Sequence, residues 1–326
     1  MAATLTTPLT KLLGVEHPVM LAGMGGVSYS RLVAAVSEAG GYGCLGASTM
    51  SPDTMVAEME AVRAATSKPF GVDLLTAMGG DLLAQVDQII EHGGTTFVAG
   101  LGVPVKAVER CHEAGVLVVN MCGKVDHARR AVDAGCDLVV AQGTEAGGHT
   151  GQVATMPLVP LIVDAVGDQV PVVAAGGLFD GRGLAAALML GAAGVWVGTR
   201  FIGTPEARGL PGFKEGILAA DETGTIVSRG FSGKTMRVLR NEMTAHYEAN
   251  PSELKPFPEQ LGISMNGGFF HLGGGEDTPG VDPSREGYPA GQAVGAIDAL
   301  IPAGDIVRQM VDEAAAVLAK AGSYLG

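Results

Sequence analysis

Up to about residue 205, the chain alternates short apolar runs with longer amphipathic stretches. The apolar runs are continuous rather than alternating, which is typical of strands buried on both faces of a parallel sheet. This pattern predicts strands at 19–23, 42–47, 70–75, 95–100, 116–121, 138–142, 171–175 and 194–198. Helices are predicted between them, near 29–39, 53–66, 81–91, 105–114, 125–134, 156–166 and 181–190.

The number and order of these elements predict an α/β fold of the (β/α)8 type, a TIM barrel. An open doubly wound sheet is the alternative. We favour the barrel because the alternation is regular and contains no long central crossover. Similar short turns also follow three of the helices, at 38–43, 113–116 and 133–137, each with a glycine where a helix C-cap needs a positive φ.

The segment 206–290 breaks this alternation. It holds polar helical stretches, followed by a run rich in glycine and proline from Gly262 to Gly291. We interpret it as an insertion, or small cap region, near the substrate site of the barrel formed by 1–205. The segment 291–326 returns to apolar residues at helical spacing, and we expect its helix to pack back on the barrel.

Composition narrows the class of protein. Apolar residues make up 47% of the chain and charged residues 17%, which suits a large buried core. The formal net charge of −13 argues against binding to nucleic acid or to an anionic membrane surface. The longest apolar stretch, 183–198, is broken by two glycines, and the N-terminus has no secretory signal pattern. The four cysteines form no C-x-x-C pair, so we expect reduced, structural thiols. Together these features predict a cytoplasmic protein.

Active sites of such barrels lie at the C-terminal ends of the strands. Gly176 and Gly177 follow the seventh predicted strand, and Gly198 and Thr199 come at the end of the eighth. Many barrels hold a phosphate in these two loops, because glycines let backbone N–H groups approach an anion. Plain turns are the alternative for either loop alone, but the pair at adjacent strand ends favours a phosphate site.

The most specific string is QGTEAGGHTG, at 142–151, after the sixth predicted strand. A histidine on a glycine-rich loop at this end of a barrel can act as a general base or acid, which makes His149 the candidate catalytic residue. The alternative is a loop histidine that only bonds nearby backbone. His271, after two phenylalanines, is a weaker candidate for lining a substrate pocket, and no pair of histidines has metal-ligand spacing. Lys124 follows the fifth strand and either faces a phosphate or reduced cofactor or is solvated.

These strings resemble the nitronate monooxygenase family, formerly called 2-nitropropane dioxygenases. The resemblance rests on AQGTEAGGHTG (141–151) and the run from 171 to 201, and on HPVMLAGMGGVS, KPFGVDLL and AGQAVG elsewhere. The histidine motif is shared with FMN-dependent enoyl-acyl carrier protein reductases and related NAD(P)H:quinone reductases. The resemblance implies FMN at the barrel mouth, held by Gly23, Met24, Asp73, Lys124, Gln142, Gly147, Gly176, Gly177, Gly198 and Thr199.

The resemblance also implies a role for His149. It matches the family's catalytic histidine, which takes a proton from the carbon next to a nitro group. The nitronate then passes an electron to FMN, and oxygen completes the reaction. Three positions depart from the family pattern: Asp73 replaces a frequent Asn, Trp196 a frequent Gln, and LAGM (21–24) a usual QAPM. An ionised Asp cannot donate a hydrogen bond, so its contact with the flavin would differ.

The leading expectation is therefore an FMN-dependent nitronate monooxygenase that acts on a small-molecule substrate with O2. One alternative is an FMN-dependent reductase or dehydrogenase that uses NAD(P)H on an enoyl thioester or a quinone. The other is a non-redox barrel that binds a phosphorylated metabolite. The sequence does not decide whether the protein forms a homodimer.

Overall fold

The computed structural model describes residues 3–76, 81–100 and 102–324. Its main sheet is parallel, in the order β1-β9-β8-β6-β5-β4-β3-β2. A parallel bridge between Met20 and Tyr42 joins β1 to β2 and closes the sheet into a barrel. The predicted (β/α)8 fold is confirmed, and the open sheet is not. The strands are β1 (Val19–Leu21), β2 (Gly43–Gly46), β3 (Phe70–Leu75), β4 (Thr96–Gly100), β5 (Leu117–Cys122), β6 (Leu138–Gln142), β8 (Val172–Ala175) and β9 (Gly194–Val197).

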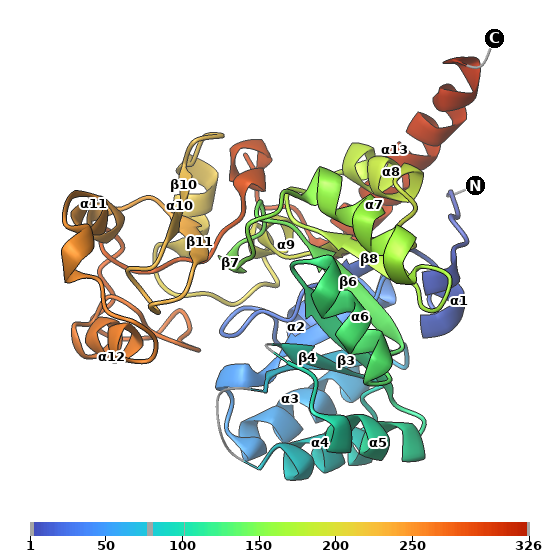
Figure 1. Ribbon diagram of the computed structural model, residues 1–326, viewed down its shortest axis with the longest axis horizontal. Coiled ribbons are helices and arrows are strands. Elements are labelled where there is room, and N and C mark those ends of the chain that lie inside the picture. Colours follow the sequence, from blue (N-terminus) through green and yellow to red (C-terminus); the bar gives the residue numbers. More distant parts are fainter. Residues whose placement is uncertain (1–2, 77–80, 101, 325–326) are drawn as a thin grey trace.

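Helices connect successive strands around the outside of the barrel, as the amphipathic stretches predict (Figure 1). They are α2 (Ser30–Glu38), α3 (Pro52–Ala65), α4 (Leu82–Glu91), α5 (Val105–Glu113), α6 (Val125–Asp133), α7 (Thr155–Val166) and α8 (Gly181–Met189). A short helix, α1 (Pro8–Leu13), packs at the opposite end of the barrel from the candidate site, where the Thr7 hydroxyl donates to the carbonyl of Ala193. A 3-10 turn, η1 (Ala47–Thr49), follows β2.

The eighth helix position is filled from the far end of the chain. Helix α13 (Ala303–Ala321) packs against α8 and α2, which are the neighbours that an eighth barrel helix must have. Its buried residues recur at helical spacing, from Ile306 to Ala314. The helical pattern from 291 onward therefore predicted the element, but the helix begins only after Pro302. The residues before it form a 3-10 turn, η3 (Gln292–Ala296), and η4 (Gly322–Tyr324) follows the helix.

Burial on both faces of the sheet explains why the strands are continuously apolar. One cluster fills the barrel interior and includes Met20, Tyr42, Val140 and Trp196. A second cluster lies between the strands and the surrounding helices, where Val139 and Val172 belong. The four cysteines are buried free thiols, as the structural interpretation expects. Within the described residues, no helix has the length and hydropathy that a membrane crossing requires.

The chain between β9 and α13 contains the segment 206–290, here called the cap segment. It lies beside the barrel at the left of Figure 1, and its Phe231, Met236, Tyr247 and Phe270 belong to a separate apolar cluster. After α9 (Thr199–Ile202) come α10 (Phe213–Ala219), β10 (Thr225–Ser228), β11 (Met236–Leu239), α11 (Glu242–Ala249), η2 (Pro251–Glu253) and α12 (Glu259–Asn266).

An antiparallel sheet joins the cap segment to the barrel. Strand β11 pairs with β10 on one side and with β7 (Gly148–His149) on the other. Since β7 belongs to the loop after β6, the cap segment is tied directly to the candidate catalytic histidine.

Candidate active site

A cavity of about 340 Å³ lies at the C-terminal ends of the barrel strands, bounded in part by the cap segment. The structure brings nearly all of the sequence-predicted site residues to its wall. These are Gly23, Met24, Asp73, Gln142, Gly147, His149, Gly176, Gly177, Gly198 and Thr199. The cap segment adds Met236, Phe270, Leu272 and Gly273.

Two predicted residues lie elsewhere. Lys124 precedes α6, its side chain is about half exposed, and its ammonium lies 3.7 Å from a carboxylate oxygen of Asp126. It is not part of the cavity wall, so the geometry gives its predicted cofactor contact no support. His271 lines a smaller neighbouring cavity of about 60 Å³. Its Nδ1 lies 2.7 Å from Oε2 of Glu286, which is fully buried.

The two glycine loops provide unpaired backbone donors at the cavity wall. Gly176 and Gly177 have positive φ values of 103° and 74°, a region that favours glycine. Their N–H groups, and those of Gly198 and Thr199, have no hydrogen-bond partner among the described residues. The four residues are partly exposed in the cavity wall, so their unpaired N–H groups can bind an anion such as the phosphate of FMN.

Helix α8 does not offer its N-terminus to that anion. The carboxylate of Asp180 already accepts from the backbone N–H groups of Arg182 and Gly183. A phosphate in this cavity would therefore be held by the strand-end loops rather than by the helix dipole.

Gly147 is required by a close contact with a distant part of the chain. A Cβ at this position would lie 2.7 Å from the carbonyl carbon of Ala290 and 2.8 Å from the nitrogen of Gly291. The Gly291 N–H donates to the Thr199 hydroxyl at 2.9 Å, and the Gln292 N–H donates to the carbonyl of Glu145 at 2.9 Å. The AGQAVG string thus ties the loop after β6 to the loop after β9.

Asp73 faces the cavity from inside the barrel. It is 8% exposed, and its carboxyl group has no hydrogen-bond partner among the described residues. Burial raises the pKa of Asp73 to about 8, since the charged form loses its hydration. At neutral pH the group is therefore mostly protonated and can donate a hydrogen bond. The expectation of an ionised, non-donating carboxylate does not take this burial into account.

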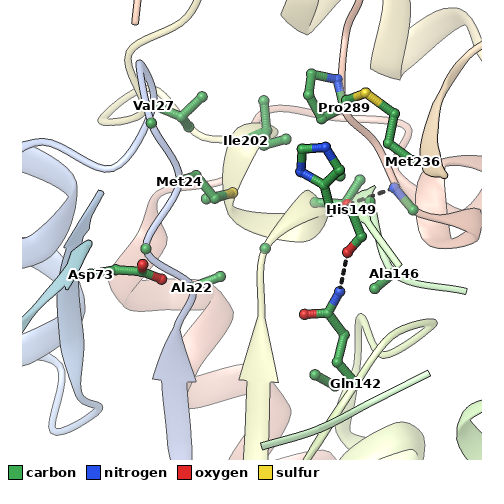
Figure 2. Close-up of a pocket in the computed structure, with 18 of the residues that line it drawn as sticks. Ala22, Met24, Val27, Asp73, Gln142, Ala146, His149, Ile202, Met236 and Pro289 are labelled. Carbon is green, nitrogen blue, oxygen red and sulfur yellow. Dashed lines mark hydrogen bonds between the residues drawn. The ribbon is translucent and has the colours of Figure 1, made fainter. Parts of the chain in front are cut away.

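His149 projects into the cavity between Ile202 on one side and Met236 and Pro289 on the other (Figure 2). Its backbone is held by two interactions. Gln142 Nε2 donates to the carbonyl of His149 at 2.7 Å, and His149 pairs with Met236 across β7 and β11. Gln142 therefore braces the histidine loop in addition to lining the cavity.

The electrostatic surroundings keep the His149 imidazole neutral. Burial lowers its pKa below the ordinary value of 6.5, and the ammonium of Lys234 lowers it further. Its Nε2 lies 2.9 Å from the Ser232 hydroxyl, and its Nδ1 has no partner among the described residues. A neutral imidazole with one bare nitrogen can accept a proton near neutral pH.

The cap residues were missed by sequence reasoning. Ser232, Lys234 and Met236 approach His149 from about 85 residues further along the chain. The sequence placed the segment 206–290 near the substrate site, but His271 was its only residue named as a candidate for lining a pocket. The cavity as a whole combines an anion cradle, apolar walls and a neutral base, which suits a phosphate-bearing cofactor and proton transfer to or from a substrate.

Comparisons with known proteins identify the family of this chain. A family model described as nitronate monooxygenase matches residues 6–82 and 75–313. The chain is 44% identical over 246 residues to a hydroxy-methyl-oxo-octahydro-indene-carboxyl-CoA dehydrogenase of Mycobacterium tuberculosis, covering 75% of this chain and 69% of the relative.

Two solved structures are similar over nearly their whole length. FabK from Thermotoga maritima has a TM-score of 0.87 and 34% identity, covering 98% of this chain and 100% of that one. Nitroalkane oxidase from Streptomyces ansochromogenes has a TM-score of 0.82 and 27% identity, covering 96% and 99%. The matches identify the chain as an oxidoreductase. It belongs to the nitronate monooxygenase family.

Proposed function

We propose that this protein is an FMN-dependent nitronate monooxygenase that oxidises alkyl nitronates or their parent nitroalkanes with O2. The observation that carries the proposal is the position of the His149 imidazole in the wall of an apolar cavity that also contains the unpaired N–H groups of the glycine loops. The family match supports the same reaction class.

The residues present fit FMN. The unpaired N–H groups of Gly176, Gly177 and Gly198 would hold the phosphate, and the inner end of the cavity, with Met24 and Asp73, would take the ring. When bound, FMN supplies the acceptor for the substrate's electrons. The protonated Asp73 carboxyl can donate to an acceptor atom placed there, as an Asn would.

His149 is assigned the proton transfer. A nitroalkane is a carbon acid, and a base must remove the proton next to the nitro group before the carbon can be oxidised. The imidazole is uncharged at neutral pH and stands among the apolar side chains of Ile202 and Met236. These side chains have no group that donates a hydrogen bond to the imidazole, so they leave its bare nitrogen free to accept the substrate's proton.

A second substrate class is favoured by one of the relatives. The 44% identical relative is named as a dehydrogenase of a carboxyl-CoA compound. An acyl thioester is also a carbon acid, so the same base would remove the proton next to its carbonyl group. The cavity wall includes Phe213, Phe270 and Leu272, which suit a larger apolar acyl group.

The test begins with the purified protein. Pigment released by heat is identified by chromatography, with FMN as the expected result. The flavin-loaded protein is then mixed, without oxygen, with an alkyl nitronate, a saturated acyl-CoA, or NADH and NADPH. Bleaching of the visible flavin band by the nitronate, followed by O2 uptake in air, supports the proposal. Bleaching only by the thioester, or only by a nicotinamide, assigns the protein to the dehydrogenase or reductase class. Well-folded protein without flavin contradicts the whole proposal.

A further inference from the structure

We propose that Ser232 of the cap segment is a positioning residue that fixes the tautomer of His149 and leaves Nδ1 as the proton-accepting atom. This inference rests on the proposed role of His149 as the base. Ser232 does not line the cavity, so it acts through the imidazole rather than on the substrate.

The hydrogen bonds around Ser232 decide the arrangement. Its hydroxyl is 2% exposed and lies 2.9 Å from His149 Nε2. It accepts from the backbone N–H of Lys234 at 3.3 Å and is placed to donate to the Lys234 carbonyl at 3.3 Å. A hydroxyl has one hydrogen and two lone pairs, so these three contacts use its whole capacity.

Only one tautomer satisfies all three contacts. If the hydroxyl donates to the Lys234 carbonyl, Nε2 must carry the hydrogen and donate to the hydroxyl oxygen. Nδ1 is then bare. In the opposite tautomer, the hydroxyl hydrogen turns to Nε2 and its bond to the Lys234 carbonyl is lost. The Nδ1–H would then have no acceptor among the described residues. The first arrangement makes one more hydrogen bond at the buried Ser232 hydroxyl, which favours it.

The turn that carries Ser232 is held in place. Gly233 has a φ of 82°, and a Cβ there would lie 2.4 Å from the backbone nitrogen of Phe257. On the other side, the Thr150 N–H donates to the carbonyl of Thr235 at 3.3 Å, and the Thr235 hydroxyl donates to the Thr150 carbonyl at 3.1 Å. The same stretch therefore fixes the backbone beside His149 and presents a hydroxyl to its ring.

The arrangement suits both protonation states of the base. The proton from the substrate carbon goes to Nδ1, while the electron pair of the broken C–H bond stays on the substrate. Nε2–H donates to the Ser232 oxygen before and after this transfer, and Ser232 neither gains nor loses a proton. Burial, and to a lesser extent the ammonium of Lys234, lowers the pKa of His149, so the neutral imidazole is the resting form.

Nitrogen NMR of the flavin-loaded protein, with ¹⁵N-labelled histidine, tests the inference without relying on turnover. The His149 signals are assigned by their loss in His149→Asn. Above the pKa of His149, the wild type should show a protonated Nε2 and an unprotonated Nδ1. Ser232→Ala should move both nitrogens toward the averaged shifts of a mixture, and Ser232→Thr should restore the wild-type pattern.

Kinetics provide the second measurement. Ser232→Ala should keep its flavin but lose about 2- to 10-fold in kcat/KM for a neutral nitroalkane, the worth of one hydrogen bond. Oxidation of the preformed nitronate should be nearly unchanged. Ser228→Ala is the matched control, because Ser228 is another serine of the cap segment and bonds Gly230 rather than His149.

The outcomes separate the two levels of the argument. An Nδ1–H tautomer in the wild type, or unchanged His149 signals in a folded Ser232→Ala, overturns the inference while His149 stays the base. Full activity of His149→Asn on the neutral nitroalkane contradicts the role of His149 as the base, whatever the tautomer is, whereas a flavin-loaded wild type that reacts with neither the nitroalkane nor its nitronate contradicts the proposed function itself. A thermal melt shows whether each variant is folded. If Ser232→Ala does not fold, the comparison of Ser232→Thr with the wild type still tests the inference.

Discussion

Replacing Asp73 by asparagine should stabilise the ligand-free protein, and the gain should grow with pH. The Asp73 carboxyl is buried without a hydrogen-bond partner among the described residues, and burial raises its pKa from 3.8 to about 8. In the unfolded chain the group loses its proton near its ordinary pKa. Between these two pKa values the unfolded state binds fewer protons than the folded state, so stability falls as the pH rises.

The size of the effect follows from the pKa difference. About four pKa units correspond to a ceiling of about 6 kcal/mol, at 1.36 kcal/mol per unit. Asparagine has nearly the same shape and no charge to bury. From pH 5 to pH 8, the free energy of unfolding of Asp73→Asn should therefore rise by up to about 4 kcal/mol relative to the wild type. Above pH 8 the difference should level off.

Urea unfolding at a series of pH values, followed by circular dichroism, measures this difference. Asp168→Asn is the control, because Asp168 is exposed on the surface. Its difference from the wild type should not depend on pH. Parallel curves for Asp73→Asn and the wild type would show that Asp73 is ionised in the folded protein and would refute the argument from burial.

Three further predictions concern the cofactor cradle, the base and the cap segment. Gly177→Val should weaken FMN binding in a folded barrel, because the residue has a φ of 74° and a Cβ would lie 3.2 Å from the Glu145 side chain. Fluorescence titration measures the affinity of the variant for FMN. If this affinity equals that of the wild type, the phosphate is not bound at Gly177. Lys234→Ala should raise the pKa of His149 and move the acid limb of the kcat/KM profile to higher pH, since the ammonium opposes protonation. If the acid limb stays at the same pH in Lys234→Ala, that limb does not report the ionisation of His149. His271→Ala should lower the free energy of unfolding by about 1–3 kcal/mol, because Glu286 is fully buried and loses its side-chain partner. A change below a few tenths of a kcal/mol, measured by urea unfolding, would contradict this.

The barrel could be predicted because its signal is local. Strand β6, for example, buries Val139 on one face and Val140 on the other, so a short run of apolar residues is enough to identify it. The glycine-rich loop after β6 identified His149 for a similar reason. The backbone of Gly147 lies so close to that of the distant Ala290 that only glycine fits there. The contact therefore appears in the sequence as a glycine.

The cap segment could not be predicted in the same way. Strand β11 buries the charged Arg237, whose Nε donates to the carbonyl of Thr144, so the strand lacks a clean apolar pattern. Its pairing with β7 joins residues far apart in the chain, and no local pattern specifies such a partner. Ser232 was missed for this reason. Lys124 shows that the position of a residue in the sequence does not fix where its side chain lies. Lys124 follows a barrel strand, as a site residue often does, but its side chain is not part of the cavity wall.

The most direct test of the central claim compares the two protonation states of one substrate. Flavin-loaded wild type and His149→Asn are each given a neutral nitroalkane or its preformed nitronate, and kcat/KM is measured for both. If His149 removes the proton, the variant should lose about 10²- to 10⁴-fold on the neutral form and much less on the nitronate, with FMN still bound. Equal losses on both forms would make His149 a binding residue, and no loss on either would remove it from the mechanism.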